Sequence, residues 1–164
     1  MALRYSGPSL QPITDAYTTD ISESAFRLIE QENVDHYAAT LLVQNEQYLG
    51  SNFGRALLGL RIKLFRPRAQ VHAFILENAP YSRTISGLEA AAKKCFNAEV
   101  GDMLAANEAT LIVQMRTPYR DWSKHEAELL DKRNSLVAAT FPEQSSSGLL
   151  AAKLSSPLGY CRES

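Results

Sequence analysis

The hydrophobic residues of this chain recur mostly at helical spacing, in segments that prolines separate. Within residues 121–141, Leu129, Leu136 and Val137 follow one another at intervals close to whole turns of an α-helix. Pro142 ends this pattern, because proline lacks a backbone donor and clashes with the preceding turn. The pattern therefore predicts a long helix that stops before Pro142.

Two serine–glutamate pairs look like the start of a helix. Ser86 with Glu89 opens residues 84–96, and Ser123 with Glu126 opens the long segment described above. In such a capping box each side chain satisfies one backbone N–H of the first turn. Residues 24–32 and 34–49 repeat the helical period nearer the N-terminus, after capping residues at Asp20 and Asn33 respectively.

Residues 60–70, LRIKLFRPRAQ, fit two patterns. As a strand, Leu60, Ile62 and Leu64 point one way and the cations between them the other, and the following AQVHAFIL would close a hairpin. As a helix from 54 to 65, the apolar residues share one arc in which only Arg61 is out of place. The helical interpretation explains more positions, since an arginine stem can lie across apolar neighbours and Pro67 supplies the end.

We therefore predict a mainly α fold. It would be a single compact multi-helix domain over residues 1–142, with an extended N-terminal arm at 1–12 and a C-terminal tail at 143–164. The alternative is an α+β fold with a hairpin at about 58–76 and a strand at about 109–116, where apolar residues also alternate.

The composition is that of an ordinary globular protein. The chain has 164 residues, of which 45% are hydrophobic and 21% charged, and it has no apolar run near the ~20 residues of a membrane span. No signal-peptide pattern opens it. Cys95 and Cys161 belong to no CxxC motif, which favours free thiols in a reducing, cytoplasmic compartment or an assembled particle over a disulfide that pins the tail.

Charge is uneven along the chain. Residues 1–50 hold seven acids and two bases, whereas 51–70 hold five bases and no acid. The acidic segment 15–46 and the basic segment 55–68 suggest docking between protein surfaces, with nucleic-acid phosphates as the second choice. The candidate partner-binding cations are Arg55, Arg61, Lys63, Arg66 and Arg68.

A second candidate partner-binding cluster lies in RTPYRDW, residues 116–122. Arg116, Tyr119, Arg120 and Trp122 are of the types enriched at protein interfaces. The alternative is a corner between two helices, with Trp122 buried.

The motifs of common enzymes are missing from the sequence. It contains no glycine-rich phosphate loop, no GxSxG and no HExxH, and its three histidines lie on separate predicted elements. We therefore predict no catalytic residue, no metal and no cofactor. The leading hypothesis is a non-enzymatic structural or assembly subunit in a homo- or hetero-oligomer. The alternatives are a helical coat-type protein bound to nucleic acid, as in a virion, and an enzyme or cofactor carrier whose site only the fold assembles.

Overall fold

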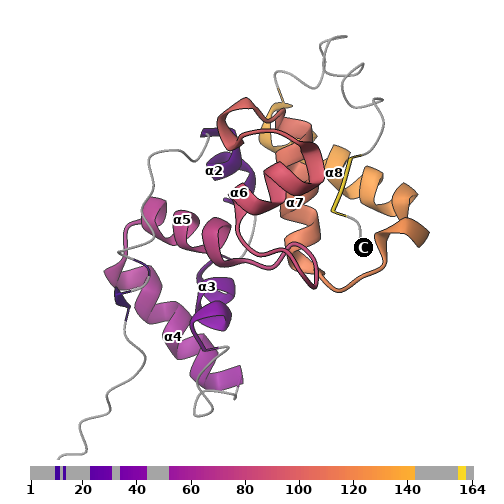
Figure 1. The fold of residues 1–164 in the computed structure, drawn as a ribbon. Helices are drawn as coiled ribbons and strands as arrows, with labels where there is room; N and C mark the ends of the chain where they lie inside the picture. Colours follow the sequence, from indigo (N-terminus) through magenta and orange to yellow (C-terminus); the bar gives the residue numbers. More distant parts are fainter. Residues whose placement is uncertain are drawn as a thin grey trace, which may run out of the picture. The chain divides into compact units, whose positions relative to one another are not determined.

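The protein is described by a computed structural model that is mainly helical, which confirms the predicted fold class (Figure 1). The structure describes Leu10, Gln11, Ile13 and residues 23–30, 34–43, 52–142 and 159–161. Most of the predicted arm at 1–12 and of the tail at 143–164 lies outside these residues. None of the described helices is both long enough and apolar enough to cross a bilayer.

The α-helices are α2 (Glu23–Ile29), α3 (Val34–Val43), α4 (Asn52–Phe65), α5 (Arg68–Asn78), α6 (Leu88–Ala91), α7 (Ala105–Arg116) and α8 (Glu126–Thr140). α6 continues as a π-helix over Ala92–Phe96, and short 3-10 turns occupy Val100–Asp102 and Trp122–Lys124.

The α+β alternative is wrong. The predicted hairpin is the helix pair α4 and α5, which Pro67 separates, and the predicted strand at 109–116 belongs to α7. In the part of the chain that the structure describes, β pairing is limited to one isolated bridge between Pro80 and Ser86. The two-residue alternation of 60–64 is therefore a coincidence within a helix, in which Ile62 is buried while Leu60 and Leu64 are exposed.

The chain divides into two compact units. The first comprises Met1–Thr18 and Asn33–Ile75, and the second comprises Thr19–Glu32 and Leu76–Ser164.

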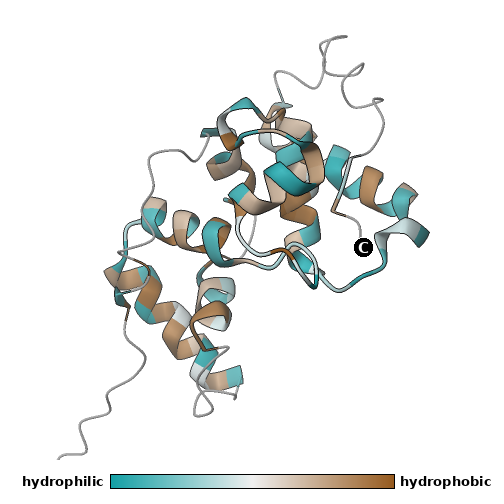
Figure 2. Cartoon of the chain, in the orientation of Figure 1, coloured by the Kyte–Doolittle hydropathy of each residue, from teal (hydrophilic) through white to brown (hydrophobic). Residues whose placement is uncertain are grey.

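In the first unit, α3 packs against α4 at a glycine. A Cβ on Gly59 would lie 3.3 Å from the backbone oxygen of Asp35, so the missing side chain is what lets the two backbones approach. Leu58 and Ile62 are buried beside Gly59. The residues of α4 that Figure 2 colours as hydrophobic are therefore only partly buried.

The second unit is built around α7. Nine of its twelve residues are buried, including every residue from Glu108 to Met115. A helix buried on all sides shows no polar stripe, which is why the sequence of this segment did not reveal its period. Ser24 of α2 donates a hydrogen bond to the buried carboxylate of Glu108, and Arg27 of α2 donates to the carbonyl oxygen of Thr140 in α8 at 3.1 Å.

Neither predicted capping box forms. The N-cap of α6 is Gly87, not Ser86, and no side chain caps it. Gly87 has φ +86°, and a Cβ there would lie 2.9 Å from the backbone oxygen of Glu77, so only glycine fits this turn. Likewise α8 begins after His125, while Ser123 donates to the Asp121 carboxylate instead. Caps proposed at Asp20 and Asn33 lie outside the described residues.

The prediction of two free thiols is wrong. Cys95 on the π-helix and Cys161 near the C-terminus form a disulfide that joins positions 66 residues apart. Spacing in sequence could not indicate this pairing, because the chain must fold before the two Cα atoms come within 4.8 Å.

Candidate functional site

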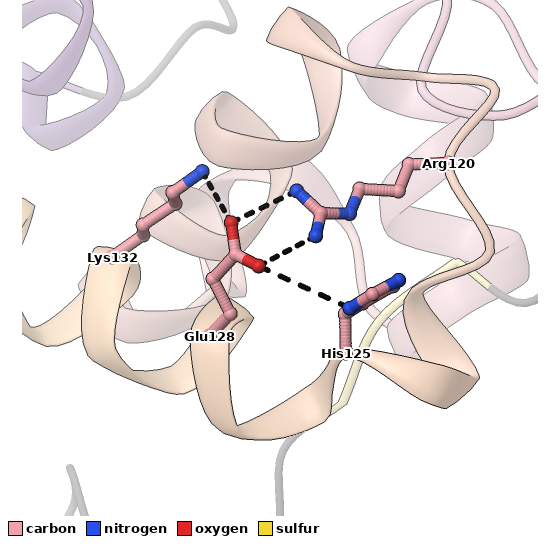
Figure 3. Close-up of polar contacts among 4 residues, drawn as sticks. All are labelled: Arg120, His125, Glu128 and Lys132. Carbon is pink, nitrogen blue, oxygen red and sulfur yellow. Dashed lines mark hydrogen bonds and ion pairs between the residues drawn. The ribbon is translucent and has the colours of Figure 1, made fainter.

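A four-residue polar cluster lies at the start of α8 and in the turn that precedes it (Figure 3). The Glu128 carboxylate accepts two hydrogen bonds from the Arg120 guanidinium, at 2.8 and 2.5 Å, and one from the Lys132 ammonium at 2.8 Å. His125 Nδ1 lies 4.0 Å from the same carboxylate. One acid thus holds two cations in place, and the paired geometry with arginine fixes the direction of the guanidinium plane.

Beneath this cluster lies the Trp122 ring. The guanidinium carbon of Arg120 is 4.8 Å from the ring centroid, and the Lys132 nitrogen is 5.8 Å from it, so both cations face the ring's electron-rich surface. Trp122 is 2% exposed and packs with Val113, Leu129 and Tyr160 in the core. The tryptophan therefore couples the polar cluster to the rigid core of the second unit.

A groove of about 540 Å³ opens beside the cluster, between the end of α7 and the middle of α8. Arg116 and Lys132 supply positive charge, Asp131 supplies a carboxylate, and hydroxyl groups and apolar side chains complete the wall. The lining residues are Val113, Arg116, Thr117, Asp131, Lys132, Ser135 and Leu136. A volume of this size and a mixed lining suit a polar organic ligand with negatively charged groups.

A smaller hollow of about 110 Å³ lies beside Trp122, which forms part of its wall. Arg120, Asp121 and Ser123 line it together with Tyr160 and Cys161 from the C-terminal segment.

The C-terminal segment 159–161 is held firmly against this region. The side-chain amide of Gln114 donates to the carbonyl oxygen of Cys161 and accepts from its N–H, both at 3.0 Å. Tyr160 donates to the Glu126 carboxylate at 2.5 Å. Together with the disulfide, these contacts hold residues 159–161 in place, where they form part of the wall of the smaller hollow.

The five cations predicted to bind a partner do not form one cluster. Arg55 donates to the Asn52 side chain at 2.7 Å, and Arg68 pairs with Asp35 at 2.7 Å within the same unit. Arg61 and Lys63 are exposed, whereas Arg66 is partly buried. At least one of the five cations is therefore engaged by an acid of the acidic segment inside the chain itself.

The second predicted cluster does come together in part. Arg120 and Trp122 stack, and Arg116 lines the groove, while Tyr119 is 61% exposed and belongs to neither. The burial of Trp122 is the arrangement that the helix-corner interpretation requires.

Sequence reasoning missed Glu128, Lys132 and Asp131. A signal for the first two exists, because an acid four residues before a lysine on a helix forms an ion pair. No comparable signal links Glu128 to Arg120, since the two lie on different elements joined by an irregular turn.

The Lys132 hydrogen bond, reinforced by Arg120, holds the pKa of the Glu128 carboxyl below its ordinary value of 4.5, against the opposing effect of desolvation. A lowered folded-state pKa stabilises the fold above the unfolded pKa, and this stabilisation disappears as pH falls through the folded pKa. The melting-temperature difference between wild type and Glu128→Gln should therefore be present at about pH 6 and shrink below about pH 4.

Thermal melts across this pH range check the expectation. Asp102→Asn, which changes an exposed acid of a 3-10 turn, is the control and should give only a small difference in melting temperature. A Glu128→Gln difference that is equally large at both ends of the range would contradict it.

Comparison with known families decides which class of protein this is. Residues 34–141 match the model of the transglycosylase family. The chain belongs to the transglycosylase family. No curated protein matches it. The match spans α3 to α8, and so includes parts of both units and every residue of the groove.

Family membership overturns the leading functional hypothesis. A transglycosylase is an enzyme of cell-wall synthesis, so the predictions of a non-enzymatic assembly subunit and of a virion coat protein on nucleic acid are wrong. The sequence carries none of the short motifs by which common enzymes are recognised, and a site that only the fold assembles needs none of them.

Proposed function

We propose that the protein takes part in peptidoglycan synthesis as a glycosyl-transferring enzyme. The observation that carries this proposal is the family match over 34–141, which covers 108 of the 164 residues. The groove between α7 and α8 is the candidate surface for the glycan substrate.

The chemistry of glycosyl transfer suits this lining. The oxygen of an acceptor hydroxyl forms a bond to the anomeric carbon of the donor, and its proton passes to a base. The bond to the leaving group breaks at the same time, and the leaving group departs with the electron pair. Cations in a fixed position favour a substrate or leaving group that carries negative charge. In the groove, Arg116 and Lys132 have this role.

The geometry supports Lys132 as the better positioned of the two cations. Its ammonium is held by Glu128 and by the Trp122 ring, so little side-chain freedom remains to be lost when a ligand binds. Thr117 and Ser135 add hydroxyl groups that can exchange hydrogen bonds with sugar hydroxyls.

An oxidising compartment outside the cytoplasm is part of the proposal. The Cys95–Cys161 disulfide supports it, since disulfides persist where thiols are not kept reduced. The usual place of action of the family agrees. This proposal replaces the expectation of a reducing compartment, which rested on the cysteines being free.

Arg116→Ala tests the groove. We expect it to raise KM for a labelled peptidoglycan precursor by about tenfold, because one charge-assisted hydrogen bond is lost, while kcat changes less. Gel analysis of polymer formed over time measures both constants. Lys124→Ala is the matched control, since its amine pairs with Asp121 at 2.9 Å and does not line the groove.

The same assay separates the proposed reaction from the proposed substrate surface. Absence of polymer with wild-type protein under every condition contradicts glycosyl transfer itself. Normal polymer formation with an unchanged KM for Arg116→Ala leaves the reaction intact and contradicts the groove as its substrate surface.

A further inference from the structure

Tyr160 links the C-terminal segment 159–161 to the groove through packed side chains. Its side chain is buried in a cluster that includes Val113 and Trp122. Val113 is at the same time part of the groove wall, and the groove cation Lys132 lies over the Trp122 ring. Displacement of Tyr160 would therefore remove packing from residues that shape the groove.

One covalent bond holds this segment in its place. The disulfide to Cys95 is formed by Cys161, the residue that directly follows Tyr160. Hydrogen bonds to the side chains of Gln114 and Glu126 add to it. Net stabilisation by a few hydrogen bonds is small, and a short terminal segment regains its conformational freedom when it leaves the surface. The disulfide therefore decides whether the segment stays bound.

The disulfide is more accessible from one of its two residues. Cys95 is partly exposed, whereas Cys161 is buried. Cys95 also lies on a π-helix, a rare helical form that occurs frequently at functional sites. Exposed disulfides are the ones that thiols reach and reduce in an otherwise oxidising compartment. An attacking thiolate is therefore expected at the sulfur of Cys95, with Cys161 as the leaving group.

We propose that the Cys95–Cys161 disulfide is a redox switch, which a dithiol reductant operates and which controls ligand binding in the groove. A thiolate of the dithiol forms a bond to the sulfur of Cys95, and the bond to Cys161 breaks. Cys161 keeps the electron pair and takes up a proton. The second thiol of the reductant then attacks the mixed disulfide and releases Cys95 as a thiol. The protein disulfide gains two electrons and two protons, and the dithiol becomes a disulfide.

Reduction frees the segment 159–161 and moves Tyr160 out of the core. The Trp122 ring then loses part of its packing, and the smaller hollow opens to solvent, since Tyr160 and Cys161 form part of its wall. Lys132, which lies over the ring and lines the groove, loses a fixed support. The groove should therefore bind its ligand less tightly in the reduced protein. This last step rests on the proposed function, whereas release of the segment does not.

Fluorescence of the whole protein tests the switch, because Trp122 is the one tryptophan of the chain. Dithiothreitol, itself a dithiol, should move the emission to longer wavelength and increase its quenching by acrylamide. The far-ultraviolet circular dichroism of the helices should stay unchanged. Tyr160→Ala should show the longer wavelength and stronger quenching already in the oxidised protein, and Cys161→Ala should not respond to the reductant. Tyr119→Ala, which changes an exposed tyrosine near Trp122 in sequence, is the matched control and should respond as wild type does.

The polymer assay tests the consequence for the groove. Reduction should raise KM for the labelled peptidoglycan precursor by about fivefold or more, and Cys161→Ala should show the raised KM with and without reductant.

The possible outcomes separate the switch from the proposed function. The switch is overturned if the emission and quenching of wild type do not change on reduction. It is equally overturned if the helices are lost together with the change in emission, because the bond then holds the whole unit together. An unchanged KM in a protein whose segment has been released overturns the control of the groove. Absence of polymer from wild type contradicts the proposed reaction, and the fluorescence result still decides whether the segment is released.

Discussion

Reduction of the Cys95–Cys161 disulfide is expected to lower the free energy of unfolding by about 4 kcal/mol. The bond joins positions 66 residues apart, so breaking it returns considerable freedom to the unfolded chain. The native contacts of the C-terminal segment, such as the paired hydrogen bonds from Gln114, remain available after reduction. Urea unfolding of the protein with and without reductant measures the difference.

Cys161→Ala provides the control for this prediction. Its unfolding should no longer respond to reductant, and its stability should approach that of reduced wild type. If the unfolding midpoint of wild type is the same in both conditions, the bond does not constrain the unfolded chain. Loss of the disulfide should also free the segment at 159–161 to open locally, which hydrogen exchange at Cys161 would detect.

Replacement of Trp122 by alanine is expected to cost about 3–5 kcal/mol. The ring fills the core between Val113, Leu129 and Tyr160, and two cations lie over it. Its removal leaves a cavity and takes away the surface against which Arg120 and Lys132 are held. Denaturant unfolding measures the loss of stability. Because Lys132 lies over the Trp122 ring and lines the groove, the same variant should also bind the proposed substrate more weakly.

Two further variants show whether burial is the cause. Tyr119→Ala changes an exposed aromatic residue of the same turn and should alter stability by no more than about 0.5 kcal/mol. Trp122→Phe should fall well short of the alanine variant, since the indole Nε1 has no hydrogen-bond partner among the described residues and only ring volume is lost. Equal effects from Tyr119→Ala and Trp122→Ala would contradict the corner arrangement.

The family assignment also changes how the two charge clusters are understood. These are the basic segment 55–68 and the turn at 116–122. The first contains an internal ion pair at Arg68 and, between its cations, the exposed side chains of Leu57, Leu60 and Leu64. In the second, the Glu128 carboxylate holds Arg120, and Arg116 lines the groove.

The sequence by itself determined where helices can form. Prolines and the spacing of leucines were enough to predict α4 and α8 as helices, because each depends only on residues that are close together in the sequence. The helical period of α7 could not be recognised in the sequence, because a helix that is buried on all sides has no polar face. The start of α6 was also mispredicted, because its N-cap Gly87 is required by the close contact with the Glu77 backbone and no side chain caps the helix.

Only the tertiary structure decided which face each helix covers and which distant residues meet. The period of α4 defines an apolar arc, but packing at Gly59 buries only the part of it with Leu58 and Ile62 and leaves Leu60 and Leu64 exposed. Likewise nothing local joins Cys95 to Cys161, or Arg120 to Glu128. Local pattern sets the backbone of each segment, whereas the candidate site depends on contacts that form after those segments pack.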